Sequence, residues 1–330
     1  MTFNPEPPQT PPTTVGQAEI RAAHARIAAY VRRTPILEAA SPLAGAPPIS
    51  LKLEFLQHSG SFKPRGAFHN LLTRRAPAVG CATASGGNHG AAVAYAAGRL
   101  GVKARIFVPE IAAPVKIAKI KAYGAEIVVK GATYFDAQAL CDAYVAESGA
   151  LAIHPYASPE TIAGQGTVGL EWEEDLGRLG GAALETILVA VGGGGLIAGV
   201  AAWFARRAKI VGVEPEGSCA LHAALAAGRP VDVSVKSVAA DSLGSRNVGE
   251  LNLAIAQRAV DRVALVTDEA IRAAQLSLWR EFSIVAEPGG AAAYSALASG
   301  AYRPAPGERV GVLVCGANAD LSIFAAPSAV

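Results

Sequence analysis

The chain has 330 residues, a net charge of +2, 51% hydrophobic residues and 17% charged residues. A chain of this length buries a large core, and its apolar share is typical of an α/β enzyme whose sheet is covered on both faces. It has no long basic or acidic run, so neither nucleic acid nor an anionic membrane is an expected partner. The four cysteines show no CxxC spacing, which favours a reducing cytoplasm.

The N-terminal third begins with a proline-rich stretch and then shows helix and strand patterns. Residues 1–15 lack an apolar core and are predicted to be a flexible leader. Apolar residues at helical spacing predict a helix over 16–31, and alternation predicts a strand over 49–55. A second helix is predicted to start just after Lys63.

The middle of the chain alternates regularly between strand and helix patterns. Strands are predicted over 79–85, 104–109, 125–131 and 151–155, with helices over 90–101, 114–124 and 133–149 between them. Such βα alternation predicts a mostly parallel sheet with helices on both faces. We therefore expect a small domain of residues 67–157, inserted into a larger domain of residues 16–66 and 158–330.

The longest uncharged run extends from Thr186 to Ala205 and contains four consecutive glycines. Its length could span a bilayer, but glycines in its middle predict a buried strand, a loop and a helix instead. Two further strands, over 208–215 and 309–318, each run into a loop. Because ligands bind at the carboxyl ends of parallel strands, the loops at 59–66, 85–90, 191–196 and 314–318 are the candidate site.

The glycine loop follows a strand and precedes a helix, which is the pattern of a phosphate site. Four glycines, Gly192 to Gly195, are more than a tight turn requires. The spacing of Gly193, Gly195 and Ala198, followed by Glu214, also fits a dinucleotide fold and an NAD-dependent oxidoreductase. That alternative leaves the lysine loop and the 85–90 loop unexplained.

The loop "SGGNHG" opens a predicted helix and would line its N-terminus with backbone N–H groups. This arrangement suits a carboxylate, such as that of an amino acid. The alternative is an ordinary helix cap made by Ser85 or Asn88. His89 alone is more often structural than catalytic.

Lys63 lies between Phe62 and Pro64 in "SGSFKPRG", where a solvating lysine is unusual. A free lysine has a pKa near 10.4 and is a poor nucleophile at neutral pH. Two anion sites and a poised lysine are the parts of a site that holds a phosphate-bearing aldehyde and an amino acid. The combination indicates pyridoxal phosphate as the cofactor.

Four stretches, "SFKPRGA", "SGGNHG", "GGGGL" and "CGAN", resemble in order the signatures of the fold-type II pyridoxal phosphate enzymes. Within that group they are similar to the threonine and serine dehydratases and to serine racemase. The resemblance covers about residues 30 to 325 and implies an α/β fold like that of the tryptophan synthase β chain. That fold has two open, twisted, mostly parallel sheets with helices on both faces.

The resemblance implies a role for each matching position. Lys63 matches the lysine that forms the Schiff base, and Asn88 matches the asparagine that binds the ring hydroxyl. Cofactor-binding positions are Phe62, Lys63, Asn88, Gly192, Gly193, Gly194, Gly195, Leu196, Glu287 and Cys315. Substrate-binding positions are Ser85, Gly86, Gly87, Asn88, His89 and Tyr156.

Three positions depart from racemase-like members. Gly86 replaces a serine that acts as an acid there, which argues against racemisation. Glu214 matches one cation ligand, but Ala220 replaces the second, so no metal is expected, with Glu214 and Glu216 as the remaining candidate ligands. The chain also ends soon after "CGAN", so no regulatory domain is expected.

The sequence thus predicts a lyase that dehydrates and deaminates L-threonine or L-serine to a 2-oxo acid and ammonia. A thiol at Cys315 would leave the pyridine ring a weak electron sink, which favours elimination over a long-lived carbanion. The alternatives are a dehydratase for phenylserine or 3-hydroxyaspartate, and serine racemase. The resemblance also implies a homodimer, expected in the cytoplasm and away from membranes.

Overall fold

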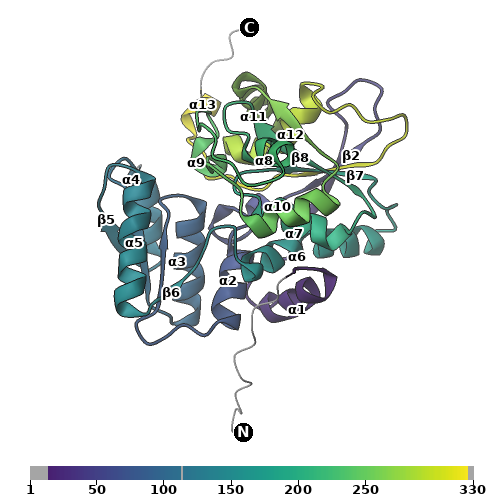
Figure 1. Ribbon diagram of the computed structural model, residues 1–330. Coiled ribbons are helices and arrows are strands. Elements are labelled where there is room, and N and C mark those ends of the chain that lie inside the picture. Colours follow the sequence, from purple (N-terminus) through teal and green to yellow (C-terminus); the bar gives the residue numbers. More distant parts are fainter. Residues whose placement is uncertain (1–13, 113, 326–330) are drawn as a thin grey trace.

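The computed structural model describes residues 14–112 and 114–325, so the predicted leader lies almost entirely outside the described residues. The chain forms two mostly parallel sheets with helices packed on them, which confirms the predicted fold class (Figure 1). None of the helices in the described ranges has the length and apolar character needed to cross a membrane.

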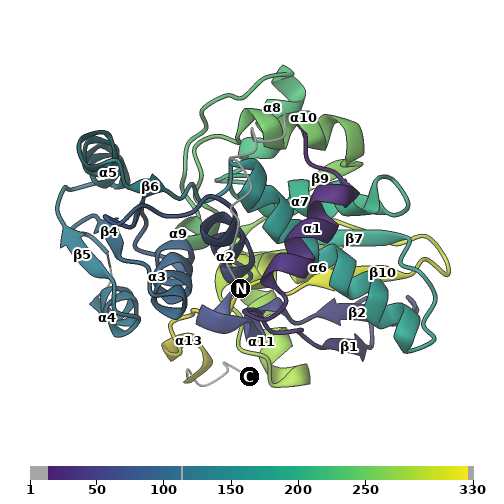
Figure 2. The same cartoon turned by 90° about the horizontal axis from the view of Figure 1, so that it is seen from below.

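The larger sheet has six strands in the order β1-β2-β10-β7-β8-β9. Their bounds are Ile36–Ala39 (β1), Ile49–Lys52 (β2), Val310–Leu313 (β10), Thr186–Ala190 (β7), Lys209–Pro215 (β8) and Arg262–Val266 (β9). Every neighbouring pair is parallel except β1 and β2. The last strand, β10, lies in the middle, where Gly311 pairs with Ser50 on one side and Ile187 on the other (Figure 2).

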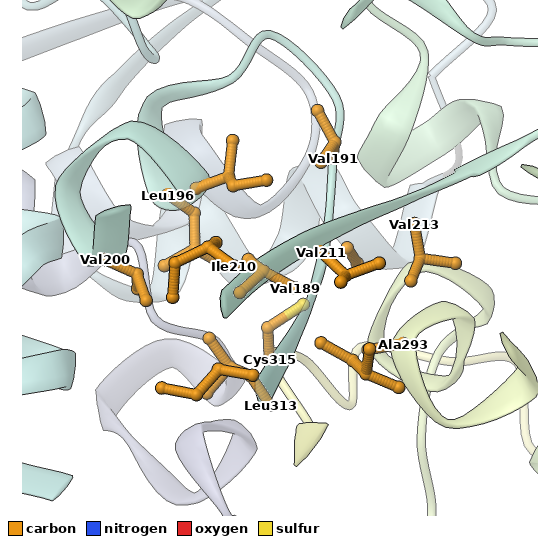
Figure 3. Packing of buried hydrophobic residues seen from close by; sticks show 14 of the residues in the cluster. Val189, Val191, Leu196, Val200, Ile210, Val211, Val213, Ala293, Leu313 and Cys315 are labelled. Atoms are coloured by element: carbon orange, nitrogen blue, oxygen red, sulfur yellow. The ribbon is translucent and has the colours of Figure 1, made fainter. Parts of the chain in front are cut away.

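Helices cover both faces of the larger sheet (Figure 1). On one side lie α1 (Gln17–Ile27), α6 (Pro159–Arg178), α7 (Gly195–Phe204) and α10 (Glu250–Ala259), and on the other lie α11 (Asp268–Phe282) and α12 (Pro288–Ala298). Short helices complete the unit: α8 (Ala220–Ala227), α9 (Ala240–Leu243) and α13 (Ser322–Ala325). The core combines side chains from strands and helices, and Val189, Val211 and Leu313 from adjacent strands pack together in it (Figure 3).

The smaller sheet has four parallel strands in the order β5-β4-β3-β6. The strands are Glu126–Val129 (β5), Ala104–Val108 (β4), Cys81–Ala84 (β3) and Leu151–Ala152 (β6), and the helices are Asn88–Leu100 (α3), Pro114–Ala122 (α4) and Tyr134–Ser148 (α5). A further helix, α2 (Pro64–Thr73), packs against both α3 and α6 and so joins the two units. We propose that these units correspond to the small and large domains expected from the sequence.

Most predicted elements are present, but four strands, those predicted over 49–55, 79–85, 125–131 and 151–155, are each three residues shorter than expected. Two strands were missed, as were α6 and the helices from α8 to α13. The strand predicted over 49–55 ends at Lys52, and a 3-10 turn follows at Glu54–Leu56. The strand predicted over 151–155 ends at Ala152, because the next residues turn so that His154 Nδ1 accepts the backbone N–H of Ala157 at 2.9 Å. The missed strands, β1 and β9, are edge strands of four and five residues.

Candidate active site

The glycine loop connects β7 to α7, as the uncharged run predicted. Gly194 has a φ of +87°, a left-handed conformation that favours glycine. A Cβ added at Gly193 would lie 2.3 Å from the ring of Tyr156, so only a glycine lets that ring pack there. The loop thus brings backbone N–H groups and the positive end of the α7 dipole to one place, which suits a phosphate.

Asn252 on α10 is hydrogen-bonded to this loop. Its Nδ2 donates to the carbonyl oxygen of Gly193 at 2.6 Å and to that of Tyr156 at 3.1 Å. Nothing in the sequence pointed to this residue, because an asparagine within an amphipathic helix looks like any solvated position. Asn252 therefore couples the glycine loop to the Tyr156 segment.

Lys63 immediately precedes α2, and its side chain points towards the 154–156 segment. Its Nζ donates to the carbonyl oxygen of Pro155 at 2.9 Å and lies 5.2 Å from the ring centroid of Phe62. Burial lowers the pKa of Lys63 to about 8, although the nearby Glu287 favours the charged form. A useful fraction of this amine is therefore neutral, and nucleophilic, near neutral pH.

The lysine loop runs beside the loop that follows β10. The Phe62 N–H donates to the Cys315 carbonyl oxygen at 3.1 Å, and Ser61 pairs with Gly316 in an antiparallel bridge. The Cys315 side chain is buried next to the apolar core (Figure 3). Burial raises the pKa of its thiol, so Cys315 stays protonated and uncharged.

The third loop opens α3, whose first residue is Asn88. Gly87 occupies the cap position and no side chain caps the helix, so the ordinary-cap alternative does not apply. The Oγ of Ser85 accepts the Gly87 N–H at 3.2 Å. His89 is turned to the Ile153 carbonyl oxygen, 3.0 Å from its Nε2, and burial lowers the pKa of its ring to about 3. His89 thus stays neutral, and its ring is bound to the residue that follows β6.

Asn88 connects this loop to the larger sheet. Its Nδ2 donates to Oε1 of Glu287 at 2.6 Å, and the Glu287 N–H donates to the Gly316 carbonyl oxygen at 3.1 Å. Glu287 caps the start of α12, so residues from three separate stretches meet beside Cys315.

One pocket collects most of the predicted residues. Its lining includes Phe62, Lys63, Tyr156, Gly192, Gly193, Gly194, Gly195, Leu196 and Cys315, together with Ser242 and Leu243 of α9. A Cβ on Gly87 would lie 3.3 Å from the carbonyl oxygen of Asp241, which places the carboxylate loop next to α9. The pocket has one end lined by the backbone of four glycines and contains a partly neutral amine, so its residues fit a phosphate-bearing aldehyde.

Glu214, the candidate ligand for a ribose or a cation, is buried at the end of β8. Its two oxygens accept the N–H groups of Leu221 and His222 at the start of α8, each at 2.8 Å. Burial raises the pKa of Glu214 to about 7. Within 14–112 and 114–325, no group of three or more His, Cys, Asp or Glu residues is arranged to hold a metal ion.

Known proteins resemble this chain over nearly its whole length. The family model described as pyridoxal-phosphate dependent enzyme matches residues 27–316. A phenylserine dehydratase of Ralstonia pickettii is 39% identical over 91% of this chain and 92% of its own. An L-threonine ammonia-lyase of Geobacter sulfurreducens is 37% identical over 92% of this chain and 75% of its own. The solved structure of maize serine racemase has a TM-score of 0.87 and 34% identity, covering 94% of this chain and 96% of its own.

Proposed function

The chain belongs to the pyridoxal-phosphate dependent enzyme family, and we propose that it dehydrates and deaminates a β-hydroxy amino acid, L-threonine or L-serine. The product would be a 2-oxo acid with ammonia. The water lost from the β-carbon is regained when the released 2-imino acid is hydrolysed, so the atoms balance. The observation that carries this proposal is the shared pocket of Lys63 and the four glycines.

The proposed roles follow from where each group lies. When bound, pyridoxal phosphate supplies an aldehyde that condenses with amines and a ring that accepts electron density from the adjacent carbon. The glycine loop and the α7 N-terminus would hold the phosphate, and Lys63 would hold the aldehyde carbon. The Ser85–Gly87 backbone and the α3 N-terminus would orient the substrate carboxylate.

Lys63 is also the proposed proton carrier. Because its pKa is about 8, Nζ can take a proton from the α-carbon and give it up again near neutral pH. Cys315 adds no negative charge at its end of the pocket, because its thiol stays protonated. This arrangement favours elimination of the β-hydroxyl over a long-lived negative charge on the α-carbon.

Gly86 argues against the racemase alternative on steric grounds. An added Cβ there would lie 2.9 Å from Cγ1 of Val108 and 3.1 Å from Cβ of Ala112. A serine acid at this position would therefore need the loop to move. Without that acid, proton delivery to the opposite face of the substrate has no assigned donor.

Phenylserine is the second candidate substrate. It is favoured by the relative named phenylserine dehydratase, which matches over nearly its full length, and by the rings of Phe62 and Tyr156 in the pocket lining. The relative named L-threonine ammonia-lyase supports the smaller substrates. 3-Hydroxyaspartate has no comparable support, although it belongs in the same comparison.

The test combines trapping with a substrate panel. Borohydride reduction of the purified protein should fix the cofactor onto Lys63, and Lys63→Ala should lose both the coloured band and turnover. Serine, threonine, phenylserine and 3-hydroxyaspartate should then be ranked by kcat/KM for oxo-acid release. If kcat/KM for phenylserine exceeds that for threonine and serine by more than about tenfold, roughly 1.4 kcal/mol, phenylserine becomes the proposed substrate and the proposed reaction stands. Interconversion of D- and L-serine without oxo acid would refute the lyase.

We also propose that the enzyme acts in the cytoplasm as a homodimer. Its amino-acid substrate class and its few scattered cysteines are consistent with that compartment. Multi-angle light scattering at several concentrations should give twice the mass of the chain. A monomer mass at every concentration would contradict the proposed dimer and leave the proposed reaction unaffected.

A further inference from the structure

A chain of hydrogen bonds crosses the site from one sheet unit to the other. Lys119 of α4 donates through Nζ to Oδ1 of Asn318 and, at 3.0 Å, to the Ser59 carbonyl oxygen. Asn318 Nδ2 donates to Oδ1 of Asn88 at 2.6 Å and to the same Ser59 oxygen at 2.9 Å. Asn88 Nδ2 donates in turn to Glu287. The chain therefore runs from an ammonium group to a carboxylate through two amides.

The two ends fix the direction of every bond between them. An ammonium group can only donate and an ionised carboxylate can only accept, whereas an amide can turn either way. Lys119 therefore requires an oxygen from Asn318, and Glu287 requires an N–H from Asn88. Both N–H groups of Asn318 are used, and Asn88 keeps one N–H beyond the bond to Glu287.

We propose that Lys119 and Asn318 are positioning residues that fix the amide of Asn88 so that it offers an N–H to the bound cofactor. This inference depends on the proposed role of Asn88 in holding the cofactor. If the amide turned over, Asn88 would present a carbonyl oxygen and lose its bond to Glu287. The two residues would thus act on cofactor affinity and colour without touching the substrate.

Two glycines in the surrounding backbone leave room for this series of hydrogen bonds. A Cβ on Gly60 would lie 2.6 Å from Asn318 Oδ1, and one on Gly316 would lie 2.0 Å from Glu287 Oε1. Ser59 has a φ of 59°, which is costly for a residue other than glycine. Its carbonyl oxygen is the one that Lys119 and Asn318 both hold. The same contacts therefore stabilise the loop that leads to Lys63.

The test measures cofactor binding as well as activity. Lys119→Met and Asn318→Ala should each raise the Kd of pyridoxal phosphate for the apoenzyme about tenfold and shift the visible band of the bound cofactor. Lys119→Arg, which can still donate, should recover most of the affinity. Lys121→Met is the matched control, because Lys121 is exposed on the same helix, and it should change neither quantity.

Wild-type Kd and an unshifted band in both Lys119→Met and Asn318→Ala would overturn the inference. If Asn318→Ala does not fold, Asn318→Asp takes its place, because a carboxylate cannot donate to Asn88. Borohydride labelling separates the two proposals. Loss of the label at Lys63 in the wild-type protein refutes the proposed function, whereas a retained label with unchanged variants refutes only the positioning role.

Discussion

The guanidinium group of Arg65 forms a two-pronged ion pair with the carboxylate of Glu54, with N–O distances of 2.7 and 2.6 Å. Both residues are fully buried, and Glu171 lies 3.0 Å from the same guanidinium and 2.8 Å from Nζ of Lys52. Arg65 follows Lys63 by two residues on the first turn of α2. The charged cluster therefore anchors the turn that carries the lysine.

Arg65→Met should destabilise the protein by about 3–5 kcal/mol, because it leaves two buried carboxylates without their main partner. Urea unfolding monitored by circular dichroism measures the change. The control is Arg178→Met, because Arg178 is exposed and lies 3.7 and 3.8 Å from Glu174 and Asp175, so its loss should cost less than about 0.5 kcal/mol. Equal effects of the two substitutions would contradict an anchoring role for the buried cluster.

Gly193→Ala should weaken cofactor binding and lower stability by about 1–3 kcal/mol, because the new methyl group overlaps the Tyr156 ring. Calorimetry and titration with pyridoxal phosphate measure the two effects. Gly177→Ala, at an exposed position of α6 with no neighbour within 4 Å, should instead raise stability by up to about 1 kcal/mol. Normal affinity in Gly193→Ala would show that the loop tolerates a side chain.

Attachment of the cofactor to the apoenzyme should speed up with pH until about pH 8 and then level off. With a pKa of about 8, roughly one tenth of Lys63 is neutral at pH 7, against about one in 3,000 at the ordinary value. Stopped-flow absorbance across pH 6.5–10.5 gives the profile. The same lowered pKa predicts that stability rises between about pH 8 and 10.5, where the unfolded chain still binds a proton that the folded one has lost. A rate that keeps rising beyond pH 9 would contradict the shift.

Removal of divalent cations should leave the melting temperature unchanged. Both oxygens of Glu214 already accept backbone N–H groups, and the α8 N-terminus supplies partial positive charge there. The measurement compares samples dialysed against EDTA with samples given Mg²⁺ or Mn²⁺. A melting temperature that falls in the presence of EDTA and recovers when Mn²⁺ is added would show that Glu214 binds a cation.

Local patterns in the sequence were enough to predict the fold class and the elements of the smaller sheet, but not α6 or the helices between β8 and β10. The uncharged run from Thr186 to Ala205 gave β7, the glycine loop and α7 because strand, glycine and helix signals lie next to one another. Edge strands such as β1 and β9 carry weak periodicity, and the placement of β10 between β2 and β7 depends on long-range pairing that no local pattern encodes.

Some residues of the candidate site could likewise be predicted from local patterns, and others could not. The structure brings Lys63, the glycine loop and Cys315 into one pocket, as their places after strands suggested, while their chemical roles stay predictions. Lys119 and Asn252 had no signal, and Asn318 lay in the predicted 314–318 loop without an assigned role, because each acts through a bond to a residue far along the chain. Sequence can mark the groups that face a ligand, whereas the groups that hold them in place depend on the assembled fold.

The central position of β10 determines the order in which the two sheets can fold during protein synthesis. On the ribosome, the smaller sheet can form once residue 152 has emerged, while β2 can pair only with β1 until β10 has been synthesised. We expect ribosome-bound chains that stop before residue 310 to resist protease within 81–152 yet to bind no pyridoxal phosphate. The lysine loop lies against Cys315 and Gly316, so we expect the nascent protein to bind its cofactor only after these two residues have been synthesised.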